Sequence, residues 1–421
     1  MGSTTRNGAL ACRGMTTSDS TTQDPAAAGV DPEALAALQA RLATEHEAGR
    51  MPAGQFALAR DGEVVLTGHV GDATDRTRFA LFSCTKALIA GVAWQLLGEG
   101  SLRTDTRAIE LIPGFGAGGR TPEWMASVTL EHLLTHTSGF PNAPLGPPRW
   151  ADRDQRVAVF ERWHGQWEPG THFQYHPTAA HWVVAEMIAV VEGRDHRDVV
   201  RSRMLEPLGL DVASFGPGGM SFGPEPAAAA AAADAADDDI AELVAVGEPP
   251  SAEELRAVFG DVEFDLGEVT PDALLVFNDP QVREIGVPGA GAISSASALA
   301  LLYQGFLHDP AGLWDPDVLA DGIGHVRCTL PNPDLGFPSN RTLGLILAGD
   351  DGLARFRGMG ATTSPRAFGH NGAAGQIAWA DPATGVSFAL TTSGIDRNFL
   401  REARRIVSLA SKGGLLVPYR P

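Results

Sequence analysis

Residues 79–94 of this 421-residue chain read Phe79-Ala80-Leu81-Phe82-Ser83-Cys84-Thr85-Lys86-Ala87-Leu88-Ile89-Ala90-Gly91-Val92-Ala93-Trp94, and this segment carries the strongest signal of the fold. Lys86 is the only charged residue between Arg78 and Glu99, and the residues after it are almost all apolar. A helix that is apolar on all sides is buried in its protein. Residues three apart on a helix share a face, so this stretch predicts a buried helix carrying Ser83 and Lys86 side by side.

Lysine is otherwise nearly absent from this chain. Lys86 and Lys412 are the only two, so 30 of the 32 basic residues (32 minus 2) are arginine. An arginine stays protonated, whereas a desolvated lysine can lose its proton and accept another. We therefore interpret Ser83 as a nucleophile and Lys86 as its proton acceptor. The alternative is a serine that caps the helix beside a lysine that extends its charge to solvent.

Composition excludes several classes of protein. The net charge of −19 and the absence of a basic stripe argue against nucleic acid and anionic membranes as partners. Cys12, Cys84 and Cys328 match neither a disulfide framework nor a metal-ligand spacing, so we expect no metal or organic cofactor. The chain lacks a membrane-spanning stretch and the long apolar segment of a secretory signal, which predicts a cytoplasmic protein. Its oligomeric state stays open.

Signals at the two ends of the chain predict a sheet. Strands flank the Asp61-Gly62 turn, two more flank a Pro/Gly turn between residues 376 and 391, and helices are expected near 31–49 and 397–411. We expect an α/β (α+β) fold: an antiparallel sheet formed from both ends, flanked by terminal helices, with a large, mostly helical insertion. The predicted domains are a disordered tail at 1–30, a sheet domain at 31–85 and 325–421, and a helical domain at 86–324. The alanine-rich stretch within about 216–256 predicts an exposed insertion.

Two other motifs suggest competing chemistry. Gly219-Met220-Ser221-Phe222-Gly223 matches the G-x-S-x-G nucleophile elbow, but it lies in a Gly/Pro-rich segment without the strand and helix that the elbow needs. His132 and His136 have the spacing of zinc ligands on a helix, but the glutamate of H-E-x-x-H is missing. We interpret both as structural, with metal-dependent hydrolysis at the histidine pair as the alternative.

Several motifs together carry a resemblance to a known family. They are Ser83-Cys84-Thr85-Lys86, the segment from Val128 to Gly139, Tyr175, the glycine-rich turn at 288–295, and Gly369-His370-Asn371-Gly372-Ala373. In order and spacing the chain resembles the serine β-lactamase and penicillin-binding protein superfamily. It is most similar to the branch of class C β-lactamases, D-alanyl-D-alanine carboxypeptidases and class VIII carboxylesterases. The resemblance covers most of the chain.

The resemblance implies roles for individual residues. Ser83 would attack a carbonyl, and Lys86 with Tyr175 would remove and return the proton, with Lys86 stabilising a Tyr175 phenolate. The backbone N–H groups of Ser83 and Ala373 would form the oxyanion hole. His370, Asn371 and Gly372 would line the site, with catalysis by His370 left open.

Departures from the family pattern bear on the substrate. The lactamase motif Tyr-x-Asn is Tyr175-His176-Pro177 here, and His370 replaces the lysine of Lys-Thr-Gly. These changes remove contacts to β-lactams and D-Ala-D-Ala peptides, so we expect a carboxylesterase that forms an acyl-serine on small or medium esters. The alternatives are a β-lactamase or carboxypeptidase-like amide hydrolase, an acyltransferase, and a non-catalytic relative that binds an acyl ligand.

Overall fold

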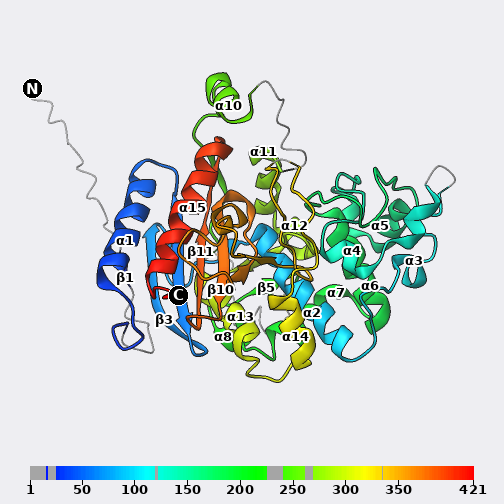
Figure 1. Ribbon diagram of the computed structural model, residues 1–421, viewed down its shortest axis with the longest axis horizontal. Helices are drawn as coiled ribbons and strands as arrows, with labels where there is room; N and C mark the ends of the chain where they lie inside the picture. The colour runs from blue at the N-terminus through cyan, green and yellow to red at the C-terminus, as the bar shows by residue number, and fades with distance from the viewer. Residues whose placement is uncertain (1–15, 18–24, 119–121, 225–239, 261–268, 334) are drawn as a thin grey trace, which may run out of the picture.

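The computed structural model describes residues 16–17, 25–118, 122–224, 240–260, 269–333 and 335–421 (Figure 1). Its strands are β1 Thr16–Thr17, β2 Ala53–Arg60, β3 Glu63–Gly71, β4 Phe79–Ala80, β5 Ser221–Phe222, β6 Val244–Val246, β7 Ala292–Ser294, β8 Ile346–Leu347, β9 Phe368–Gly369, β10 Ile377–Asp381, β11 Val386–Thr392 and β12 Gly394–Asp396.

The helices carry most of the middle of the chain. They are α1 Pro32–Glu47, α2 Lys86–Gly98, α3 Ala108–Leu111, α4 Leu130–Leu134, α5 Arg153–Phe160, α6 Ala179–Glu192, α7 His196–Val200, α8 Val212–Phe215, α10 Ala252–Phe259, α11 Pro271–Leu274, α12 Pro280–Ile285, α13 Ala296–His308, α14 Pro316–Gly324 and α15 Phe399–Leu415. Short 3-10 helices include Phe82–Thr85 and Ala373–Gly375.

The main sheet is built from both ends of the chain, as predicted. Its strand order is β1-β3-β2-β11-β10-β9-β8, so the N-terminal hairpin joins the C-terminal strands where β2 pairs antiparallel with β11. The Asp61-Gly62 turn sets the hairpin, because both residues adopt positive φ, 52° and 80°, which suits a two-residue turn between twisted strands. The expected fold class is confirmed.

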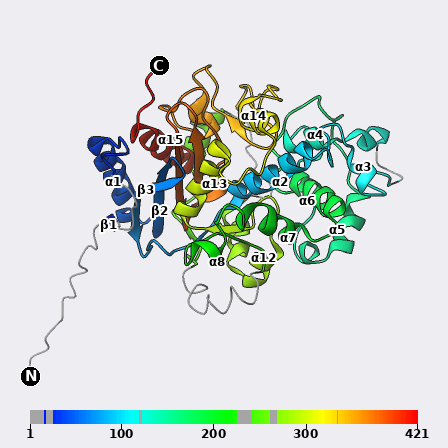
Figure 2. The same ribbon diagram turned by 90° about the horizontal axis from the view of Figure 1, so that it is seen from below.

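Helices cover both faces of this sheet (Figure 2). α1 and α15 pack against each other on one face, while α13 contacts β2, β11, β10 and β3 on the other. Asp31 caps α1 by accepting hydrogen bonds from the Glu33 and Ala34 amides, with Pro32 at the first helical position. The sequence signals for this helix are therefore confirmed.

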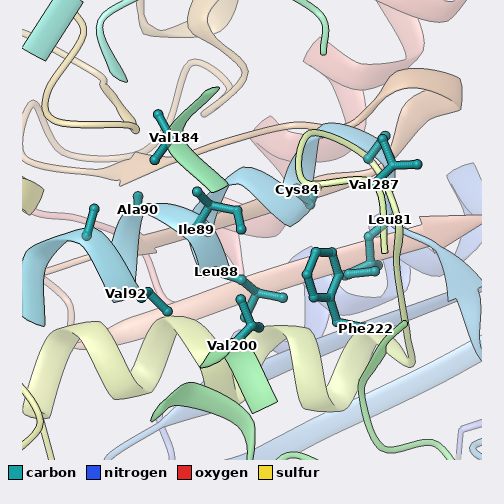
Figure 3. Close-up of a cluster of buried hydrophobic side chains, with 14 of the residues drawn as sticks. Leu81, Cys84, Leu88, Ile89, Ala90, Val92, Val184, Val200, Phe222 and Val287 are labelled. Carbon is teal, nitrogen blue, oxygen red and sulfur yellow. The ribbon is translucent and has the colours of Figure 1, made fainter. Parts of the chain in front are cut away.

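Helix α2 is buried, as its composition predicts. Leu88, Ile89 and Val92 are fully buried, and they share a cluster with Val184 of α6 and Val200 of α7 (Figure 3). Burying each such side chain stabilises the fold by about 1.5–3 kcal/mol relative to leaving it exposed. This packing holds the start of α2, and with it Lys86, in a rigid position.

Some predictions concern segments at the limits of the described residues. In the predicted tail, 1–15 and 18–24 lie outside them, while Thr16–Thr17 pairs with β3 and Ala28 is buried. Most of the alanine-rich stretch, 225–239, also lies outside. The division into two domains stays a prediction. No helix among the described residues is long and apolar enough to cross a membrane.

Candidate active site

Ser83 lies in a 3-10 turn, Phe82–Thr85, and α2 begins only at Lys86. The prediction of one helix that carries both Ser83 and Lys86 is therefore corrected, because Ser83 lies in the 3-10 turn that precedes α2. Phe82, just before it, has φ 46°, a left-handed conformation that costs a non-glycine residue roughly 1–2 kcal/mol. The Phe82 ring packs edge-on against Phe277, with centroids 5.4 Å apart, and this buried contact holds the strained turn. The turn leaves Ser83 partly exposed between buried neighbours.

Lys86 contacts three oxygens. Its Nζ lies 3.0 Å from Ser83 Oγ, 2.7 Å from the Pro177 carbonyl oxygen and 2.8 Å from the Gly289 carbonyl oxygen. A neutral amine has two N–H donors and one lone pair. If the two carbonyls accept the two N–H bonds, the lone pair is left facing the Ser83 hydroxyl. The arrangement therefore suits a neutral lysine that accepts the serine proton.

The electrostatic surroundings favour that neutral form. Lys86 is fully buried, and burial lowers its pKa well below the ordinary value of 10.5, with the Arg341 charge lowering it further. Cys84 opposes this fall, but its effect is smaller than those of burial and Arg341. A lysine with a depressed pKa is deprotonated at lower pH than an exposed one, so it can act as a base closer to neutral pH.

Tyr175 lies on another side of Ser83. Its hydroxyl donates to Ser83 Oγ at 2.7 Å, and Lys86 Nζ lies 5.1 Å from the centre of its ring. The buried surroundings raise the pKa of Tyr175 to about 12, although the Ser83 hydrogen bond and Arg341 oppose the rise. A phenolate is therefore disfavoured, contrary to the expectation that Lys86 would stabilise one. Tyr175 is suited to donate a proton.

Arg341 also belongs to this site, although no sequence motif points to it. Its guanidinium lies over the Tyr175 ring, 5.3 Å from the centroid, and over the Phe173 ring at 5.4 Å. Burial lowers its pKa to about 10, so it stays charged at neutral pH. Arginine is common in this chain, and nothing in the sequence around position 341 distinguishes it.

His370 faces Arg341 rather than Ser83. Its Nε2 lies 3.2 Å from Arg341 Nη1 and its Nδ1 lies 2.8 Å from the Asn371 carbonyl oxygen. Arg341 must be the donor to Nε2, which leaves the His370 proton on Nδ1. Burial and the charge of Arg341 lower the pKa of His370 well below 6.5, so the ring is neutral. Both ring nitrogens are thus engaged away from the serine.

Of the segment from His370 to Ala373, only Ala373 lines the same cavity as Ser83. Ser83 and Ala373 both line a cavity of about 440 Å³, whereas His370, Asn371 and Gly372 are not among its lining residues. Asn371 instead donates to the Gly358 carbonyl oxygen at 3.3 Å. Ala374 has φ 60°, so a left-handed residue adjoins each of the two proposed oxyanion-hole amides. Strained residues held this way are typical of functional sites.

The serine and histidines of the two competing motifs make hydrogen bonds within the fold, as expected of structural residues. Ser221 lies on β5, a strand followed by bends at Gly223 and Pro224, and it accepts a hydrogen bond from Arg78 Nη1 at 3.3 Å. His132 caps α4 by accepting from the Thr129 amide at 3.2 Å, while His136 Nδ1 accepts from the His176 amide. In the described part of the chain, no three His, Cys, Asp or Glu side chains are grouped as metal ligands.

Helix α15 supports the turn that contains Ala373. Glu402 of α15 is held near the Ala374 and Asp396 amides, and Arg405 Nη2 lies 3.6 Å from its carboxylate. Asp396 itself pairs with Arg401 at 2.6 Å. Burial raises the pKa of Glu402 from 4.5 to about 7, despite the opposing effect of Arg405. The folded protein therefore holds the Glu402 proton more tightly than the unfolded chain does.

This raised pKa predicts a pH-dependent loss of stability. The contribution of protonated Glu402 to the free energy of unfolding is fully present below about pH 4.5 and is lost as the pH rises through about 7. Glu402→Gln should therefore raise the free energy of unfolding at pH 8 by up to about 2 kcal/mol relative to the unmodified protein, with little difference at pH 5. Thermal unfolding at both pH values measures this, with Glu248→Gln on the exposed surface as the control. An equal effect of Glu402→Gln at pH 5 and pH 8 would contradict the assignment.

Comparisons with known proteins identify relatives across most of the chain. The model of the Beta-lactamase family matches residues 37–411. The esterase/beta-lactamase LipL of Mycobacterium tuberculosis is 26% identical over 323 residues, which span 74% of this chain and 68% of LipL. A penicillin-binding protein homologue from Caulobacter crescentus has a TM-score of 0.68 at 24% identity, covering 91% of this chain and 98% of the homologue. A family VIII carboxylesterase has a TM-score of 0.67 at 22% identity, covering 90% and 97%.

Proposed function

Since the chain belongs to the Beta-lactamase family, we propose that it is a serine hydrolase that cleaves carboxylic esters through an acyl-serine intermediate. One observation carries this proposal: a buried lysine whose two other hydrogen-bond partners are carbonyl oxygens faces the hydroxyl of Ser83. The esterase relative LipL supports the choice of ester as substrate.

The proposed reaction follows from the contacts around Ser83. Ser83 Oγ attacks the ester carbonyl carbon while its proton passes to the Nζ lone pair of Lys86. The Ser83 and Ala373 amides stabilise the oxyanion. The C–O bond to the alcohol then breaks, and Tyr175, the neutral donor beside Ser83, protonates the leaving oxygen. Lys86 returns the proton to Tyr175, and water attacks the acyl-serine by the reverse sequence.

Two features favour esters over β-lactams and D-Ala-D-Ala peptides. Pro177 stands where the lactamase motif has asparagine, and its carbonyl is already engaged by Lys86. The cavity beside Ser83 has no charged lining residue among those described. Arg341, however, returns a positive charge near position 370, and it supports a second candidate function: hydrolysis of a carboxylate-bearing amide or lactam.

A substrate profile tests the choice between these two functions. A p-nitrophenyl ester, nitrocefin and a D-Ala-D-Ala peptide are compared by kcat/KM, with intact-mass detection of the acyl-enzyme. We expect the ester to exceed nitrocefin at least about tenfold, because each missing hydrogen bond to a charged group costs about 1.5–3 kcal/mol. Nitrocefin hydrolysis at the rate of the best ester would overturn the proposal in favour of the second function.

The small-molecule ester is the only partner we propose. The location of the enzyme in the cytoplasm is retained as a proposal from the sequence.

A further inference from the structure

The cavity beside Ser83 is larger than an acetyl group requires. It measures about 440 Å³, and its large apolar side chains include Phe82, those of the loop with Leu145 and Trp150, and those of the α11 region with Leu274 and Phe277. A cavity of about 150 Å³ can hold benzene, so this volume is sufficient for a group of roughly eight carbons or more.

The walls of the cavity are apolar and mutually packed. The Trp150 and Phe277 rings lie 6.2 Å apart, and Phe277 also meets Phe82 edge-on. The Trp150 indole N–H is already used, because it donates to the Leu145 carbonyl oxygen at 2.7 Å. Among the described lining residues, only Ser83 and Thr178 carry a side-chain hydroxyl and none carries a charge. A polar or charged group would find few partners there, so the cavity favours an apolar one.

The position of the proton donors indicates which half of an ester enters the cavity. Tyr175, Lys86 and Arg341 are not among the lining residues, although Tyr175 and Lys86 both contact Ser83 Oγ. The leaving oxygen must receive its proton, so it has to lie on the Tyr175 side of Ser83. The cavity, which Tyr175 does not line, is then left for the acyl chain.

On the basis of the proposed function, we infer that this cavity is the acyl pocket and that the preferred substrates carry an uncharged, apolar acyl group of at least about eight carbons. The walls of Phe82, Leu145, Trp150, Leu274 and Phe277 set this preference. The alcohol half of the ester is left largely unselected.

Two ester series test the inference. In the first, p-nitrophenyl esters from acetate to laurate vary the acyl chain; kcat/KM should rise up to about fourfold per methylene, as about 0.8 kcal/mol each implies, and keep rising at least to the octanoate. In the second, acetate esters of alcohols of increasing length should change kcat/KM by less than about twofold per methylene. A steep rise in the alcohol series instead would assign the cavity to the leaving group and overturn the inference.

A variant that fills the cavity links the preference to its walls. Ala273 lines the cavity on the exposed side of α11, so Ala273→Trp can occupy space without disturbing the core. We expect it to lower kcat/KM for the octanoate at least about tenfold and to leave the acetate within about twofold. Ala257→Trp, on the exposed surface of α10 and away from the cavity, is the matched control. Equal losses for acetate and octanoate in Ala273→Trp would overturn the inference.

The tests separate this inference from the proposed function. If no ester is hydrolysed and Ser83 forms no acyl-enzyme, the proposed function itself fails. If esters are hydrolysed but acetate is the best substrate, the function stands and the acyl pocket is rejected.

Discussion

Ser83→Ala is expected to lower ester turnover by at least about 10⁴-fold, because no other group can form the acyl intermediate once the nucleophile is removed. The fold should survive, since Ser83 is partly exposed and the change removes a single oxygen. Steady-state kinetics on a p-nitrophenyl ester measure the loss, and circular dichroism checks the fold. A fluorophosphonate should label the unmodified protein once, on the peptide that contains Ser83.

Ser221→Ala is the matched control for that loss. Ser221 stands in the G-x-S-x-G motif, but its hydroxyl accepts from Arg78 and has no lysine beside it. Turnover should therefore stay within about twofold of the unmodified protein. Equal loss in the two variants, or labelling on the Ser221 peptide, would refute the assignment of Ser83 as nucleophile.

Lys86→Arg should reduce acylation by several orders of magnitude, about 10³-fold or more. The substitution keeps a positive charge but removes the ability to accept a proton, because a guanidinium does not deprotonate in proteins. In the unmodified enzyme, activity should rise with pH as Lys86 loses its proton, and the lowered pKa of Lys86 brings this rise well below 10.5. The acylation rate from stopped-flow kinetics, measured across pH, checks both expectations.

The chain supplies a matched control, since its only other lysine is Lys412 in the last turn of α15. Lys412→Arg makes the same chemical change away from Ser83 and should leave acylation unchanged. Thermal unfolding of Lys86→Arg should be compared with that of Lys86→Met, because the bulkier guanidinium meets a fully buried site. Near-native acylation by a folded Lys86→Arg protein would show that the proton acceptor lies elsewhere.

Features that depend on neighbours along the chain could be predicted from the residues alone. Asp31 and Pro32 start α1, Asp61-Gly62 turns the hairpin, and the Ser83–Lys86 spacing brings their side chains together within one turn. Each of these features depends on local backbone geometry, so residue type and spacing are enough to predict it. The apolar run after Lys86 likewise predicted that α2 is buried.

The arrangement of those residues for chemistry depends on contacts between segments that are distant in sequence. Pro177 and Gly289, which accept the Lys86 protons, are 91 and 203 residues away along the chain. Arg341 contacts Tyr175 and His370 from another segment of the chain. Because His370 accepts a hydrogen bond from Arg341, its ring faces the guanidinium and not Ser83. Desolvation reversed the expectation for Tyr175, because burial raises its pKa while it lowers that of Lys86.

The apolar cavity is also a product of tertiary packing. Phe82, Leu145, Trp150 and Phe277 come from segments that no local pattern connects, and each is an ordinary core residue when considered alone. Burial, long-range hydrogen bonds and the field of distant charges arise only when separate segments meet. For this reason the sequence determined which residues are candidates, and the packed structure decided which atoms face Ser83.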